Sequence, residues 1–148
     1  MKIMYCNIHW WIIHGLDFIV KEIAEKENLK VVELRYNKRL FSQGHIQILS
    51  AGIEDFLSLI YNARYVITNS FHGTIFSILF EKNFYTLKIN GVNSRIENIL
   101  NITELNNRCI ENVSEIDLKK KIDFKNAKDK IEKEREHSQE FLRNVLKK

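Results

Sequence analysis

Short apolar runs of strand length alternate along this chain with stretches whose apolar residues recur at the spacing of a helix. This alternation is typical of βαβ units, in which helices connect parallel strands and cover the sheet that they form. The predicted strands are Lys2–Asn7, Lys30–Leu34, Ile46–Leu49, Tyr65–Thr68 and Phe84–Lys88. Helices are expected to open near Leu16, Gly52, His72 and Ser94, with a last helix over Lys125–Leu146. The pattern therefore predicts an α/β fold with a parallel sheet.

The length and the charge distribution indicate a single domain, residues 1–148, that does not bind nucleic acid. No low-complexity stretch or internal repeat interrupts residues 1–118. The net charge of +4 comes from the end of the chain, because residues 119–148 hold 11 Lys/Arg and 6 Asp/Glu. Lys and Glu are mixed there as on a solvent-exposed helix. We therefore predict that 119–148 forms a basic C-terminal helical segment.

Cysteine and histidine usage indicates a cytoplasmic protein without a metal centre. Cys6 and Cys109 are too few for a disulfide framework. The apolar start, Lys2–Val20, contains polar residues and no small-residue cleavage site, so we expect a soluble chain with at most peripheral membrane association. Four histidines lie on different predicted elements, which argues against a metal site: His9, His14, His45 and His137.

The run Val66–Thr74 (VITNSFHGT) is the most unusual polar segment, because a strand leads through a tight turn into the apolar helix that includes Ile75–Phe80. Either His72 or Ser70 is expected to cap this helix; with His72 as the cap, Phe71 and Phe76 would form a hydrophobic staple. Ligands of open parallel sheets bind beyond the carboxyl ends of the strands. The turn is therefore the first place to look for function.

The loop Asn90–Arg95 follows the next predicted strand, so its polar groups are expected to meet those of the turn if the two strands are neighbours. Free N–H groups at two helix starts, a guanidinium and an imidazole favour a phosphate or a carboxylate. The candidate anion-binding residues are Thr68, Ser70, Gly73, Thr74, Asn93 and Arg95, with His72 as the candidate catalytic group. Gly73 would let a ligand approach the backbone closely. Helix caps, turn hydroxyls and surface ion pairs are the structural alternatives for these residues.

The segment Glu54–Ser77, continued by Asn93–Leu100 and Leu105–Arg108, resembles the polysaccharide pyruvyl transferase family over roughly residues 50 to 110. Weaker similarity extends over the flanks. The resemblance implies a Rossmann-like, three-layer domain like the C-terminal half of a GT-B-like glycosyltransferase architecture. It also implies transfer of a pyruvyl group, as a ketal, from phosphoenolpyruvate to a sugar of a cell-surface glycan. No cofactor is implied, since phosphoenolpyruvate is itself the donor, with a carboxylate and a phosphate.

Residue by residue, the resemblance places His72 at the motif histidine, as a general acid/base, and Arg95 at a later arginine, as an anion clamp. Ser77 matches a motif serine but lies on an apolar helix, where packing is expected. Ser70 stands where many members carry an arginine, and Asn83 where a proline is common.

The resemblance covers only the C-terminal half of the family, so the isolated chain is expected to be incomplete as an enzyme. Two alternatives remain open. The domain could serve a nucleotide-sugar glycosyltransferase, or it could be a non-catalytic module that pairs with a separate N-terminal half or a second copy.

Overall fold

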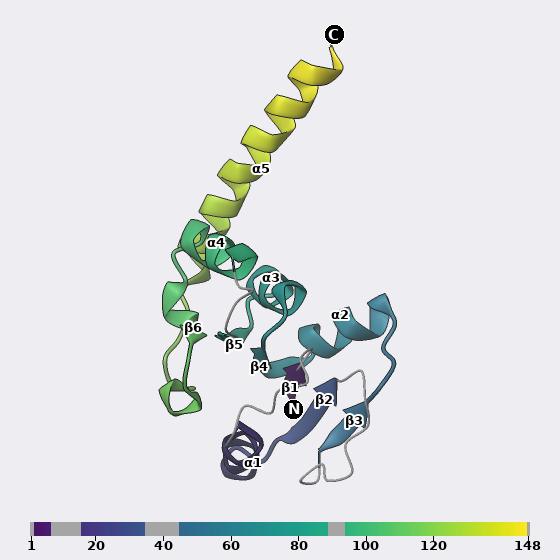
Figure 1. The fold of residues 1–148 in the computed structure, drawn as a ribbon, viewed down its shortest axis with the longest axis vertical. Helices are drawn as coiled ribbons and strands as arrows, with labels where there is room; N and C mark the ends of the chain where they lie inside the picture. The colour runs from purple at the N-terminus through teal and green to yellow at the C-terminus, as the bar shows by residue number, and fades with distance from the viewer. Residues whose placement is uncertain (1, 7–15, 35–44, 89–93, 148) are drawn as a thin grey trace.

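The computed structural model describes residues 2–6, 16–34, 45–88 and 94–147. Within these ranges the strands form one six-stranded parallel sheet in the order β3-β2-β1-β4-β5-β6 (Figure 1). The strands are β1 Lys2–Cys6, β2 Lys30–Leu34, β3 Ile46–Ile48, β4 Ala63–Thr68, β5 Asn83–Leu87 and β6 Cys109–Ile110. This is the strand order of the Rossmann fold. The predicted α/β class and parallel sheet are confirmed.

The described part of the chain has five helices: α1 Leu16–Lys26, α2 Ile53–Tyr61, α3 Phe71–Leu79, α4 Ser94–Ile102 and α5 Phe124–Leu146. Two 3-10 turns, η1 Asn106–Arg108 and η2 Val113–Glu115, flank β6. Figure 1 shows α1 on one side of the sheet and α2, α3 and α4 on the other. The predicted helices are confirmed with small shifts at their ends.

Two apolar cores make the fold a three-layer sandwich, because alternate side chains of a strand point to opposite faces. On the α1 side, Val20 and Ala24 pack against Tyr65 and Ile67 of β4. On the other side, Val66 of the same strand packs with buried residues of all the remaining helices. Those helical residues are Ile60, Ile78, Ile96, Leu100 and Ala127.

The topology places one turn at the point where the strand order reverses. β1 lies between β2 and β4, and its last residue, Cys6, pairs with Thr68 at the end of β4. In sheets of this type the crevice beside the reversal is the usual ligand site. The turn from β4 into α3 leaves the sheet at this crevice.

Helix α5 packs against the domain only near its start, through Ala127 and Ile131, and then projects away from it (Figure 1). None of the helices that the structure describes is long and apolar enough to cross a membrane. A group of three potential metal ligands is likewise absent from the described ranges.

Candidate functional site at the end of β4

Ser70 is the residue that caps α3, which settles the alternative that the sequence left open. Its backbone is extended, with φ −93° and ψ 134°, and its Oγ accepts the Gly73 N–H at 3.3 Å. Phe71 and His72 are therefore the first two residues of the helix, and the staple geometry expected for a His72 cap does not apply. Ser70 is 5% exposed.

Glycine is required at position 73 by the packing of α3 against β4, which the sequence alone could not show. A Cβ at this position would lie 2.4 Å from Thr68 Oγ1, far inside ordinary contact. Thr68 is fully buried, and its Oγ1 accepts the Ser70 N–H at 3.0 Å. The missing side chain of Gly73 thus lets the start of α3 rest on the last residue of β4, where we had expected it to make room for a ligand.

A chain of buried hydroxyls continues from the turn to the next strand. Thr74, fully buried, donates from Oγ1 to the Ser70 carbonyl at 2.9 Å, and its Oγ1 lies 2.9 Å from Thr86 Oγ1 on β5. One turn further on, the Ser77 hydroxyl donates to the Gly73 carbonyl at 2.7 Å. The hydroxyls of Thr68 and Thr74 therefore shape the turn from inside, and Ser77 packs as expected.

His72 and Arg95 lie on the outside of the turn and meet at one aromatic ring. The guanidinium carbon of Arg95 lies 5.0 Å from the centre of the Phe71 ring, a cation–π distance. The His72 ring lies edge-on to the Phe71 ring, with the two centroids 5.6 Å apart and the ring planes at 70°. The side chains of His72 and Arg95 are exposed, whereas Phe71 is half-buried. The starts of α3 and α4 are therefore neighbours, and Phe71 links them.

We call the surface formed by Phe71, His72 and Arg95 the rim. Arg95 has no ion-pair partner among the described residues, whereas Lys88 is paired. Lys88, just after β5, lies 3.4 Å from Glu111 and 3.7 Å from Glu97. Glu111 first, and then Glu97, raise the pKa of Lys88. Among the described residues, no carboxylate comes within ion-pair distance of Arg95. An anion at the rim would thus find one guanidinium that is not already paired.

The second predicted loop, Asn90–Arg95, is described only from Ser94 onward. Asn93 lies outside the described residues. The spacing of Ser94 and Glu97 predicts a capping box with Ser94 as the cap, but Ser94 is the first residue of α4, and Glu97 lies 3.7 Å from Lys88. Arg95 therefore lies in the first turn of the helix.

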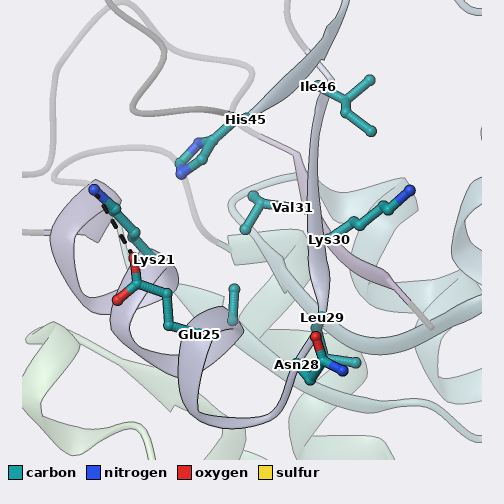
Figure 2. A pocket seen from close by; sticks show the side chains of 9 residues that line it. Lys21, Glu25, Asn28, Leu29, Lys30, Val31, His45 and Ile46 are labelled. Atoms are coloured by element: carbon teal, nitrogen blue, oxygen red, sulfur yellow. Dashed lines mark ion pairs between the residues drawn. The ribbon is translucent and has the colours of Figure 1, made fainter.

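A pocket of about 510 Å³ lies at the opposite, amino edge of the sheet, beside the starts of β2 and β3 (Figure 2). His45 points into it towards α1, where Lys21 and Glu25 pair at 4.0 Å. It contains none of the predicted site residues. Because the topology directs ligands to the carboxyl edge, we regard the exposed rim around Phe71 as the candidate site.

The rim can recognise an anion and move a proton. A guanidinium offers paired N–H donors to a carboxylate or phosphate, and the first turn of α3 adds its helix dipole. An imidazole can give or accept a proton near neutral pH. Sequence reasoning proposed His72 and Arg95 and considered Phe71 only as a packing residue, so it missed the contact of Phe71 with both.

The model of the family described as polysaccharide pyruvyl transferase matches residues 2–91. The match includes all strands from β1 to β5 and the turn with His72, and it ends before Arg95. Compared with the expected range of about 50 to 110, it begins much earlier and stops sooner. No curated protein and no solved structure matches the chain.

Proposed function

This chain belongs to the polysaccharide pyruvyl transferase family, and from that premise we propose that its carboxyl-edge rim binds phosphoenolpyruvate for transfer of the pyruvyl group to a glycan sugar. The observation that carries the proposal is the guanidinium of Arg95, which lies on the Phe71 ring beside His72 and has no ion-pair partner in the part of the chain that the structure describes. A donor with a carboxylate and a phosphate is the kind of ligand that such a rim favours.

In the proposed reaction one sugar hydroxyl adds to C2 of phosphoenolpyruvate while C3 takes up a proton. A second hydroxyl of the sugar then displaces the phosphate at C2 and loses its proton, which gives the cyclic ketal and inorganic phosphate. His72 is the proposed proton carrier in these steps, because an imidazole holds either protonation state near pH 7. Arg95 is proposed to hold the donor's carboxylate or phosphate.

The buried residues of the turn have a positioning role in this proposal. Thr68 and Thr74 fix the turn through their internal hydrogen bonds, and Ser70 and Gly73 set the start of α3. Asn93 stays a proposed anion ligand on the evidence of the sequence alone. Catalysis therefore depends on residues that do not touch the donor as well as on those that do.

Chemical-shift mapping with phosphoenolpyruvate tests the proposal. We expect saturable shifts at the amides from Ser70 to Gly73, and an affinity about ten-fold lower in Arg95→Gln, since a hydrogen bond to a charged group is lost. Arg135→Gln is the matched control, because Arg135 lies on α5 and pairs with Glu132 at 2.6 Å. No response of the turn at millimolar ligand, or equal losses in the two variants, would refute the assignment.

The strand order favours one second candidate. Rossmann folds bind the diphosphates of nucleotides at the strand-order reversal, which here is the same crevice. A nucleotide-sugar glycosyltransferase would therefore use the same rim. Thermal shift with uridine diphosphate, guanosine diphosphate and phosphoenolpyruvate separates the two functions. A glycosyltransferase should be stabilised more by the nucleotides than by phosphoenolpyruvate, and a pyruvyl transferase should not.

A further inference from the structure

Arg108, the last residue of η1, is a buried cation on the other edge of the domain. It is 1% exposed. Its Nη1 donates to Asn83 Oδ1 at 3.1 Å and its Nη2 to the Lys120 carbonyl at 2.6 Å. Its guanidinium carbon lies 4.9 Å from the centre of the Tyr85 ring. Each of these partners is electrically neutral.

Among the described residues, Arg108 has no carboxylate in direct contact, and Asp117 acts on its charge only from a longer distance. No carboxylate among them comes within ion-pair distance, and the Nε proton has no acceptor. Buried charges are normally paired, because desolvation of an ion is costly. Consistent with this, burial lowers the pKa of Arg108. A guanidinium with a spare N–H and no ion-pair partner in the described part of the chain is a group to which an anion can bind.

Arg108 lines a pocket of about 220 Å³, which we name the Arg108 pocket. Its other lining residues are Thr103, Glu104, Leu105, Asn107, Lys121, Ile122, Asp123 and Asn126. η1 precedes β6, and Asn83 begins β5, so this pocket lies at the amino edge of the sheet. It shares no residue with the rim around Phe71.

The two carboxylates of the Arg108 pocket already have partners. Glu104 accepts from Lys130 at 2.8 Å and from Asn126 at 2.6 Å, and these contacts, with Lys130 first, lower its pKa. Asp123 caps α5 by accepting the Lys125 N–H at 3.0 Å. In the described ranges, no carboxylate lies within ion-pair distance of the ammonium of Lys121. Two cations of the pocket are therefore left for a ligand.

We propose that the Arg108 pocket binds a small tetrahedral oxyanion, such as phosphate or a phosphomonoester, between Arg108 and Lys121. The volume is several times the roughly 30 Å³ that one water occupies in the liquid, which suits an ion of this size. Paired N–H groups of arginine match the oxygens of a phosphate, while a lysine supplies a mobile point charge. This site does not depend on the function proposed for the carboxyl edge.

The Nε–H signal of Arg108 gives a direct test in the 148-residue chain. Inorganic phosphate is titrated at constant ionic strength into the Arg95→Gln variant, so that binding at the other edge is suppressed. We expect the Arg108 Nε–H resonance to shift and saturate as the proton gains an acceptor. A resonance that stays fixed up to tens of millimolar phosphate would overturn the proposal.

Lys121→Gln supplies a second test, because replacing Arg108 itself risks unfolding the segment that it holds. Lys121 is exposed, and we expect its loss to weaken phosphate binding by about five-fold, as for an exposed ion pair. Lys119→Gln is the matched control, since Lys119 is exposed and does not line the pocket. Equal phosphate affinity in the two variants would count against a site at Lys121.

Discussion

Replacing Gly73 by alanine should destabilise the domain more than any other glycine change that the structure describes. The new Cβ would lie 2.4 Å from Thr68 Oγ1, about 1 Å short of ordinary contact. Thr68 cannot swing aside into solvent, because it is fully buried and accepts the Ser70 N–H. The strain therefore has to be absorbed by moving α3 away from β4 or by breaking that hydrogen bond.

The expected magnitude follows from three contributions. Overpacking costs about 1–3 kcal/mol, and weakening one buried hydrogen bond costs about 1 kcal/mol. Alanine regains up to about 1 kcal/mol in a helix through lower conformational entropy in the unfolded chain. We therefore expect a net loss of about 2 kcal/mol in the free energy of unfolding.

Urea denaturation followed by circular dichroism measures this loss, which corresponds to a midpoint lower by about 1 M urea. Gly52→Ala is the control, because the nearest atoms to its added Cβ are carboxylate oxygens at 3.6 and 3.7 Å. Hydrogen exchange adds a local readout, since the Ser70 amide should exchange faster if Thr68 is displaced. Equal midpoints for the two alanine variants, with a protected Ser70 amide, would refute the reasoning.

Three further predictions follow from the rim and the surface. Ser70→Ala removes the capping acceptor of α3 and should lower the free energy of unfolding by about 1 kcal/mol in the same urea assay. Phe71→Leu keeps an apolar residue but removes the ring under Arg95, so calorimetry should show phosphoenolpyruvate bound about three-fold more weakly. Contact with Lys130 lowers the pKa of Glu104, so its stabilising contribution is present above the usual pKa near 4.5 and disappears as the pH falls through the lower folded value. Glu104→Gln should accordingly flatten the acid limb of a stability–pH curve, and an unchanged limb would contradict it.

Most helices and strands could be predicted from the sequence, but the order of the strands in the sheet could not. The alternation of strand and helix patterns predicted five of the strands, but β6 has only two residues, too few for any periodicity. The apolar pattern predicts a helix over His72–Glu81, but α3 ends at Leu79, because Glu81 has a positive φ of 53°, which a helix does not tolerate. The position of β1 between β2 and β4 depends on contacts between distant segments, which no local pattern contains.

Local sequence patterns also determine which parts of the site could be predicted, because they contain no contacts between distant segments. The polar residues of the turn stood out because they follow a strand and precede a helix. The choice of Ser70 over His72 as the cap depends on backbone angles that either residue allows. The contact of Arg95 with Phe71 joins residues 24 positions apart, and only the packing of α4 beside α3 brings them together.

The hydrogen bond between Thr74 and Thr86 allows the stability of the turn to be tested separately from ligand binding at the rim. Thr74→Val leaves the Thr86 hydroxyl on β5 without its buried partner, so we expect a loss of about 1–3 kcal/mol in the free energy of unfolding. Valine at both positions removes donor and acceptor together and should cost less than the sum of the single changes. Arg95→Gln, at an exposed side chain, should leave the urea midpoint unchanged while weakening phosphoenolpyruvate binding.

The two threonine changes leave the rim's own charges in place, so we expect any effect of theirs on binding to act through the position of α3. If the double valine variant recovers stability and binding together, the hydroxyls serve the rim only by fixing the turn. If it recovers stability while binding stays weak, Thr74 has a direct part in holding the donor, and the positioning role assigned to it is wrong.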